Sequence, residues 1–163
     1  MRKQKGFSLI ELLIVVAIIL IIAAIAIPNL LRSRIAANEA SAVGSIRTIN
    51  TAEVTYASTY PNLGFAALAS LGGAGGTAAG AGLIDTVLAA GNKSGYTFAV
   101  VLGAAPAGST VIPSYAVNGD PQNAQTGQRH FCSDQSGVIR YDVSAAIASA
   151  GDTGCVTTAA PLQ

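Results

Sequence analysis

The residues of this chain that could do chemistry are few and lie far apart. Glu11 lies inside a run that is apolar from Phe7 to Ile27, and two cysteines, Cys132 and Cys155, lie near the other end. An ionised side chain near the centre of a bilayer costs about 3 kcal/mol or more, and such residues usually have a partner and a function. The apolar run contains nothing else that could neutralise Glu11. We therefore expect Glu11 to be a functional residue.

A second feature lies just before the apolar run. Gly6 separates a basic leader from Phe7, and a protease accepts a small glycine easily. Cleavage between Gly6 and Phe7 would create a new α-amino group four residues before Glu11. A buried ammonium and a buried carboxylate about 4 Å apart attract by about 4 kcal/mol at an effective dielectric constant near 20. If the two groups belong to neighbouring copies, the contact repeats head to tail without closing, which is the symmetry of a filament.

The remaining candidate groups do not form an enzyme site. His130 is the single histidine, which excludes a multi-histidine metal site within one chain. A nucleophilic Cys132 beside His130 competes with a disulfide, but no third orienting group is evident. The spacing of a calcium loop is absent, and the glycine-rich run lacks the lysine of a phosphate-binding loop. We expect no enzyme, no cofactor and no metal site, and turns at Asp120-Pro121 and at Asp134 to Gly137. Four aspartates could bring oxygen ligands to a calcium ion from loops, but they lack the spacing of a calcium loop: Asp120, Asp134, Asp142 and Asp152.

The apolar run is the element that must position Glu11. Its 21 residues from Phe7 to Ile27 are enough to cross the roughly 30 Å hydrocarbon core of a bilayer as a helix. The basic residues of the leader stay on the cytoplasmic side, so the chain after Pro28 is expected outside the cytoplasm. The run is too long for an ordinary cleaved secretory signal. The plain alternative is a signal anchor that holds an external binding or adhesive module.

These residues resemble a known family. The segment Lys5-Gly6-Phe7-Ser8-Leu9-Ile10-Glu11-Leu12-Leu13-Ile14-Val15-Val16 is similar to the amino-terminal signature of the type IV pilins and of the pseudopilins of secretion systems. The resemblance implies that a prepilin peptidase cuts after Gly6, that Phe7 becomes N-methylated and that Glu11 guides assembly. Pro28 occupies the proline position of the family. Larger residues such as Leu20 replace a glycine that members often have in this helix.

Beyond Pro28 the pattern becomes amphipathic and predicts that the helix continues to Tyr60, with Pro61 as its stop. The expected core face repeats at three- and four-residue steps. Its members are Leu31, Ile35, Ala42, Ile46, Ile49, Tyr56 and Tyr60. The charged residues are expected on or near the other face, in contact with solvent or with another subunit. They are Arg32, Arg34, Glu39, Arg47 and Glu53.

The rest of the chain predicts a connection followed by strands. Residues 61–94 form a loop rich in Gly and Ala, interpreted as a flexible linker or a subunit contact, with a short helix or turn from Leu83 to Ala90 that ends at Gly91. Alternation then predicts strands in residues 95–163. They cover 96–102, 114–118, 129–133 and 138–143, and residues 134–137 join the last two as a hairpin.

The expected fold is therefore α+β. A long amino-terminal helix, with a transmembrane half (7–28) and an amphipathic half (29–60), packs against a small antiparallel β-sheet of three to four strands. The resemblance implies the same architecture, with residues 1–6 as a leader removed on maturation. Outside the cytoplasm, Cys132 and Cys155 are expected to form a disulfide worth about 3 kcal/mol. The bond would tie the segment around 149–158 to the sheet.

Composition fits an exported structural subunit. Only 10% of the residues are charged, and 51% are hydrophobic. After cleavage the chain would keep six basic and eight acidic residues, so strong nucleic-acid binding is not expected. The resemblance implies the major pilin of a type IV pilus, first a single-pass protein of the inner membrane and then a helical homopolymer on the cell surface. Its implied partners are the prepilin peptidase and the pilus assembly machinery. The alternatives are a minor pilin or a type II secretion pseudopilin.

Overall fold

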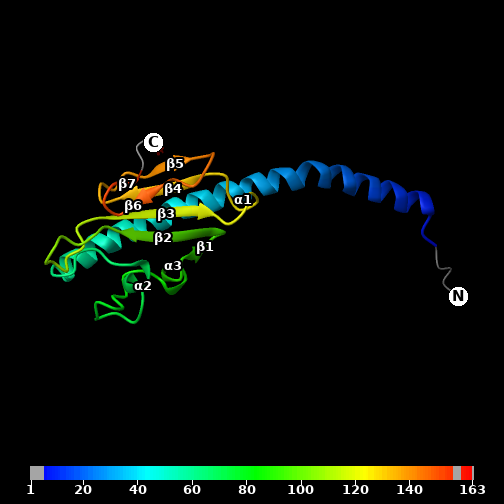
Figure 1. Ribbon diagram of the computed structural model, residues 1–163. Helices are drawn as coiled ribbons and strands as arrows, with labels where there is room; N and C mark the ends of the chain where they lie inside the picture. Colours follow the sequence, from blue (N-terminus) through cyan, green and yellow to red (C-terminus); the bar gives the residue numbers. More distant parts are fainter. Residues whose placement is uncertain (1–5, 156–158, 163) are drawn as a thin grey trace. The chain divides into compact units, whose positions relative to one another are not determined.

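A computed structural model describes residues 6–155 and 159–162 of the chain. The chain divides into two compact units, residues 1–34 and residues 35–163. Helix α1 (Leu9–Thr59) is the element that runs through both units (Figure 1). The other helices and all described strands belong to the second unit, so the fold class is α+β, as expected from the sequence.

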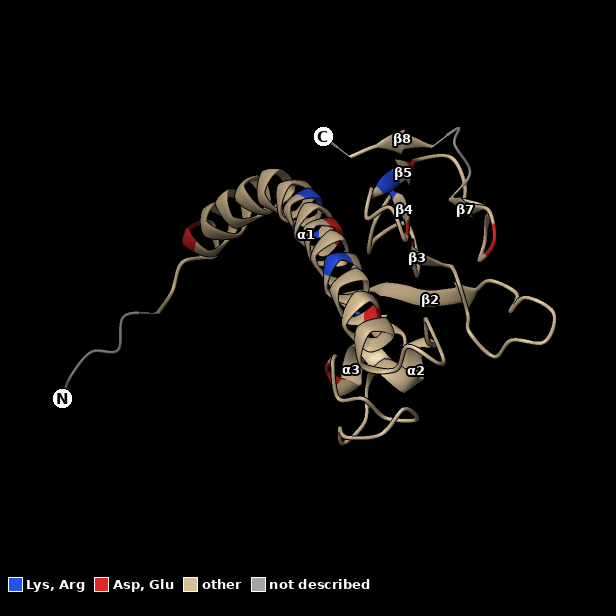
Figure 2. Ribbon diagram, turned by 90° about the vertical axis from the view of Figure 1, so that its left-hand side faces the viewer, with Lys and Arg blue, Asp and Glu red and all other residues tan. Residues whose placement is uncertain are grey.

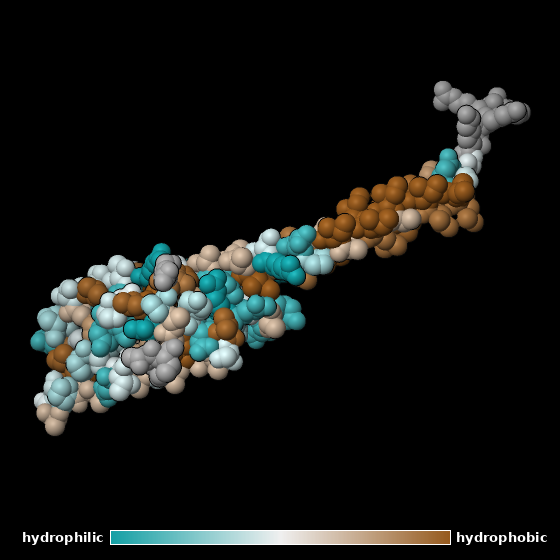
Figure 3. Space-filling model, turned by 90° about the horizontal axis from the view of Figure 1, so that it is seen from above, coloured by the Kyte–Doolittle hydropathy of each residue, from teal (hydrophilic) through white to brown (hydrophobic). Residues whose placement is uncertain are grey.

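The first unit consists of the amino-terminal part of α1. Pro28 lies inside the helix, and the helical assignment continues through it. The large apolar side chains of this unit are exposed, from Phe7 just before the helix (76%) to Leu20 within it (63%). They form a continuous hydrophobic surface (Figure 3). In the part of the chain that the structure describes, α1 is the one helix that is long and apolar enough to cross a membrane.

In the second unit, the stretch of α1 from Ile35 to Thr59 supplies one wall of the core. Ala42, Ile46, Ile49 and Tyr56 are buried, as the periodicity predicts, but Leu31, predicted on the same face, is 46% exposed. The helix ends at Thr59, and Leu63 N–H then donates to the carbonyl of Tyr60 at 2.9 Å. The stop comes just before Pro61 because the residue before a proline avoids the helical conformation.

The other wall is an antiparallel sheet with the strand order β1-β2-β3-β4-β5-β8. The four predicted strand segments correspond to β2 to β5, and β4 pairs with β5 as the expected hairpin, with His130 opposite Asp142. The sheet nevertheless has six strands where three to four were expected. The additional strands, β1 and β8, have two residues each, which is too short for any alternation to be visible. The strands are β1 (Asn92–Lys93), β2 (Tyr96–Leu102), β3 (Tyr115–Pro121), β4 (His130–Asp134), β5 (Arg140–Asp142) and β8 (Ala160–Pro161).

The core lies between α1 and one face of this sheet. Tyr96 and Phe98 of β2 and Phe131 of β4 point into it and are at most 4% exposed. A separate, smaller cluster lies on the opposite face of the sheet, where a short hairpin packs against β3 and β4. This hairpin consists of β6 (Ser149–Ala150) and β7 (Gly154–Cys155).

Between α1 and the sheet, the chain forms two short helices and a glycine-rich turn. The helices are α2 (Leu68–Leu71) and α3 (Thr86–Ala89); α3 replaces the longer predicted helix, and Gly91 at φ 81° follows it. The glycine-rich run returns along α2, since Ala81 N–H donates to Ser70 O at 2.8 Å and Leu83 N–H to Leu71 O at 2.7 Å. Tyr56 Oη donates to Ala78 O at 2.8 Å. The run is therefore folded and is not an unstructured linker. Figure 2 shows how few charges the connecting segments carry.

Candidate functional site

The amino-terminal segment has a defined local geometry around Glu11. Gly6, Phe7 and Ser8 precede the helix, which begins at Leu9. Ser8 N–H donates to Glu11 Oε2 at 2.9 Å. A serine at the N-cap with a glutamate three residues later is a capping box, in which the acid satisfies an orphan backbone donor at the start of the helix. Glu11 is therefore held by its own chain, close to the positive end of the helix dipole.

Sequence reasoning missed this contact. The sequence predicts no group in the apolar segment that could neutralise Glu11, whereas the structure shows that the backbone N–H of Ser8 donates a hydrogen bond to it. The signal was present in the pattern Ser8-Leu9-Ile10-Glu11, which is a capping box directly before an apolar run. The cap leaves the carboxylate exposed at the helix start, one turn from Phe7, so it does not prevent a second partner.

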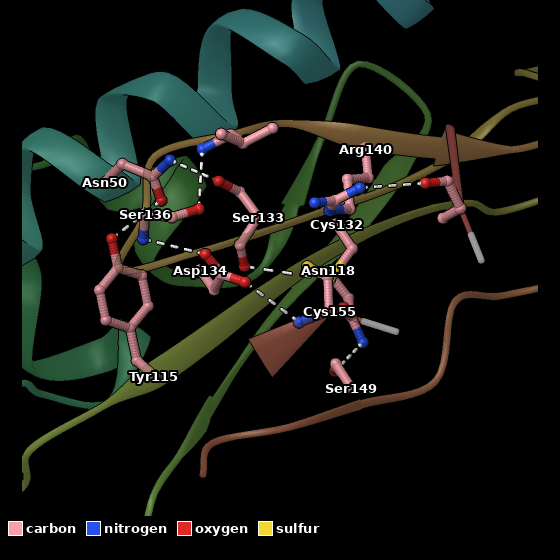
Figure 4. The surroundings of a disulfide bond; sticks show 12 residues. Asn50, Tyr115, Asn118, Cys132, Ser133, Asp134, Ser136, Arg140, Ser149 and Cys155 are labelled. Atoms are coloured by element: carbon pink, nitrogen blue, oxygen red, sulfur yellow. Dashed lines mark hydrogen bonds between the residues drawn. A yellow bond between two sulfur atoms is a disulfide. The ribbon is translucent and has the colours of Figure 1, made fainter. Parts of the chain in front are cut away.

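The disulfide forms the centre of the second site. Cys132 on β4 and Cys155 on β7 are bonded, with their Cα atoms 5.9 Å apart (Figure 4). The bond excludes a free thiol nucleophile at Cys132. Both cysteines are buried, together with Ile147 and Ala159. The bond fastens the β6–β7 hairpin to the outer face of the sheet; residues 156–158 of the segment predicted to be tied down lie outside the described residues.

Polar contacts support the same hairpin from both sides. Asn118 Nδ2 donates to Ser149 Oγ at 2.7 Å, and Cys155 N–H donates to Asp134 Oδ2 at 3.3 Å (Figure 4). Asp134 also accepts from Ser136 N–H at 2.9 Å, which closes the predicted turn from Asp134 to Gly137. The Asp134 and Asn118 side chains thus stabilise the disulfide layer, by which we mean the Cys132–Cys155 bond and the β6–β7 hairpin that it holds on the sheet.

Glu39 on α1 forms an ion pair that sequence reasoning did not find. Its Oε1 accepts from the backbone N–H groups of Gln128 and Arg129 at 3.0 and 3.2 Å, and Arg129 Nε donates to Oε2 at 2.7 Å. The Arg129 guanidinium also lies over the rings of Phe131 and Tyr141, at 5.8 and 5.6 Å from their centroids. The pair joins α1 to the segment before β4.

The prediction that Glu39 and Glu53 lie on a solvent-facing or subunit-facing side of the helix is wrong. Glu39 is 6% exposed and Glu53 is fully buried, whereas Arg32, Arg34 and Arg47 are exposed. The spacing contained the signal, because Glu39 precedes Ala42 by three positions and Glu53 follows Ile49 by four. Both acids therefore lie on the core face of the helix, although their charge alone predicts the solvent-facing side.

His130 lies partly exposed on β4, and its Nδ1 is 2.6 Å from Asp120 Oδ1 on β3. The predicted turn at Asp120-Pro121 is wrong, because both residues belong to β3. The strand extends to Pro121 because β3 pairs with β2 along its whole length. Among the described residues, no three His, Cys, Asp or Glu side chains are arranged to hold a metal ion.

The sequence of the chain is similar to those of known proteins, and the family match lies in the amino-terminal segment that contains Glu11. A family model described as "Prokaryotic N-terminal methylation motif" matches residues 1–27. The chain is 67% identical over 39 residues to the "Type IV wide pilus major component PilA4" of Thermus thermophilus, a match that covers 24% of this chain and 30% of that protein. The amino-terminal part of the chain is thus similar to that of type IV pilins. The chain is also 43% identical over 54 residues to the "Type IV major pilin protein PilA" of Myxococcus xanthus, covering 33% of this chain and 24% of that protein.

These similarities cover only part of the chain. The matches span less than a third of the length of each of these relatives, and the family model covers only the amino-terminal segment. No solved structure is significantly similar to the chain. The disulfide, the Glu39–Arg129 pair and the buried Glu53 all lie in the second unit, outside the residues that the family model matches.

Proposed function

We propose that this pilin is the major structural subunit of a type IV pilus. It is made as a prepilin, held in the inner membrane by the amino-terminal part of α1, cut between Gly6 and Phe7, methylated at Phe7 and polymerised into a surface filament. The observation that carries the proposal is the exposed apolar stretch of α1 up to Ile27, whose one charged residue, Glu11, lies at the helix start within the segment that the N-terminal methylation motif matches. The names of both relatives support the assignment to a major pilin.

The exposed apolar surface gives the physical reason for polymerisation. Side chains from Phe7 to Ile27 are covered by lipid in a membrane and need other apolar partners once the subunit leaves it. Packing these helices together supplies that cover. After cleavage, the Phe7 α-amino group of one copy and the Glu11 carboxylate of another would pair, which sets the register of the helices. Pro28 lies at the outward end of this contact region. The prepilin peptidase and the pilus assembly machinery act on this segment.

The decisive experiment is mass spectrometry of the native protein sheared from the cell surface. We expect a chain that begins at N-methylated Phe7, contains the Cys132–Cys155 bond and is abundant in the sheared fraction. A processed chain confined to the periplasm or present as a trace would favour a pseudopilin or a minor pilin. An intact Met1 found only in membranes would contradict the proposal and leave a signal-anchored module.

A variant pair at Glu11 separates its charge from its capping role. Glu11→Gln keeps an oxygen that accepts from Ser8 N–H but removes the charge, whereas Glu11→Ala removes both. If the carboxylate pairs with the amine of a neighbour, both variants are cleaved after Gly6 but neither reaches the sheared fraction. The attraction lost is about 4 kcal/mol per contact, against about 1 kcal/mol for a cap.

Arg34→Gln serves as the control, because Arg34 is exposed and lies outside the apolar run. We expect it to assemble. Normal filaments from Glu11→Gln together with defective filaments from Glu11→Ala would show that Glu11 acts only as a helix cap, and would contradict the pairing.

A further inference from the structure

Glu53 is a fully buried carboxylic acid that neither the pilin signature nor the disulfide layer uses. It lies on the core face of α1, one turn before Tyr56, and its exposed fraction is zero. An ionised group in such a place is costly unless it is paired with an opposite charge and fully hydrogen-bonded. The environment of Glu53 supplies no opposite charge from the described residues and only part of the hydrogen bonding that an ionised carboxylate needs.

The two carboxyl oxygens of Glu53 have different surroundings. Oε2 accepts a hydrogen bond from the backbone N–H of Ala66 at 3.0 Å. Oε1 is buried and has no hydrogen-bond partner among the described residues. Among the described residues, no lysine, arginine or histidine nitrogen lies within ion-pair distance of Glu53. The acids that do form ion pairs there are Asp85, Glu39 and Asp120.

The titratable groups that face Glu53 are tyrosines, so none of them can supply a positive charge. From α1 comes Tyr56, and from β3 comes Tyr115, whose ring packs on Phe65 with centroids 4.7 Å apart. Burial and the nearby charge of Glu53 raise the pKa of Tyr115, while burial, Tyr60 and Glu53 raise the pKa of Tyr56. The connecting segment contributes Phe65 and Ala66, which do not titrate. Burial raises the pKa of Glu53 to about 7, against the smaller opposing effect of the Ala66 hydrogen bond.

The hydrogen bond to Ala66 fastens one particular segment, residues 63–66, to the helix. On its other side this segment is bound to Ile112: Phe65 N–H donates to Ile112 O at 3.1 Å, and Ile112 N–H donates to Leu63 O at 2.8 Å. Gly64, at φ 77°, approaches the Ile112 carbonyl so closely that a Cβ would overlap it. Residues 63–66 thus lie between α1 and Ile112, with Glu53 as the helix-side attachment.

We propose that Glu53 is a proton-controlled attachment point for residues 63–66: the neutral acid keeps the segment docked on α1, and loss of its proton to solvent releases the segment so that water reaches the carboxylate. The docked state holds a proton that the open state loses more readily. Docking is therefore fully favoured below the ordinary glutamate pKa of 4.5, weakens as pH rises from there to the docked-state pKa of about 7, and changes no further above it. The outcome is a pilin surface whose connecting segment responds to neutral pH.

Hydrogen exchange of the full chain in detergent micelles tests this. Protection of the backbone amides in residues 60–67, corrected for the pH dependence of intrinsic exchange, is measured from about pH 5.5 to about pH 8.5. We expect the opening constant of this segment to rise by up to about tenfold per pH unit between the ordinary glutamate pKa of 4.5 and about pH 7, since one proton is released per opening in that range, and to level off above about pH 7, where Glu53 is ionised in both states. Glu53→Gln, which remains neutral, is expected to show no such rise. Asp85→Asn, a change at an exposed acid, is expected to keep the wild-type pH dependence.

Two results would overturn the proposal: protection in residues 60–67 that is independent of pH in the wild type, or the same pH dependence in Glu53→Gln. If Glu53→Gln does not fold, the carboxyl carbons of the three glutamates are followed by NMR in wild-type protein with ¹³C-labelled glutamate. One carboxyl resonance is then expected to titrate near neutral pH. Titration of all three in the ordinary acidic range would equally reject the idea.

Discussion

Single residues decide how α1 is attached to the sheet, and Glu39 is the clearest case. It accepts three hydrogen bonds from Gln128 and Arg129 while it is 6% exposed. Glu39→Ala leaves two backbone donors and a guanidinium without their acceptor. We expect a loss of about 2 to 3 kcal/mol in the free energy of unfolding, below the value for a fully buried pair because Arg129 reaches solvent. Urea unfolding of the full chain in detergent measures it.

A second ion pair provides the control at this scale. Lys93 contacts Asp85 at 2.8 Å, but both side chains are well exposed. Lys93→Ala is expected to change the free energy of unfolding by less than about 0.5 kcal/mol, because solvent screens such pairs. Equal losses for Glu39→Ala and Lys93→Ala would mean that burial does not decide the strength of the Glu39 contact.

Among the elements, the β6–β7 hairpin depends most on a single covalent bond. It covers the outer face of the sheet with a small core of its own, centred on Cys132 and Cys155. Replacing both cysteines with serine is expected to lower the free energy of unfolding by about 2 to 4 kcal/mol. Because the main core between α1 and the sheet contains neither cysteine, its secondary structure is expected to persist.

Limited proteolysis of the double variant, beside circular dichroism, measures the two effects separately. We expect new cleavage within residues 144–155 and an unchanged helical signal at low temperature. Loss of the helical signal along with the hairpin would show that the disulfide layer and the main core unfold as one unit.

At the scale of the whole molecule, the two units have different tasks. The main core contains no residue before Ala42, and the first unit has no buried residue among those described. We therefore predict that residues 35–163 fold without residues 1–34, as a monomer in the absence of detergent. Size-exclusion chromatography and thermal unfolding test this, and a melting temperature within about 5 °C of the full chain is expected, a shift equivalent to about 1 kcal/mol. An unfolded truncated chain would show that the first unit contributes to stability.

Much of the architecture could be predicted because it depends on local patterns. Pro61 stops the helix through the conformation of its own neighbour, the alternation from Tyr96 to Leu102 specifies a half-buried strand, and the Asp134 to Gly137 turn closes a hairpin between adjacent segments. The two-residue strands β1 and β8 could not be predicted, because two residues have no measurable periodicity. They pair only because β2 and β5 present free edges.

The apolar amino-terminal segment, its single acid and the family to which that segment is similar can be read from consecutive residues. Which charges are buried depends on the tertiary structure. Glu39 meets Arg129, ninety positions away, and Glu53 meets Ala66 in a segment that folds back over the helix. A helical pattern states which residues share a face, but the burial of an acid on that face depends on what packs against it. That information comes from the sheet and the connecting segment.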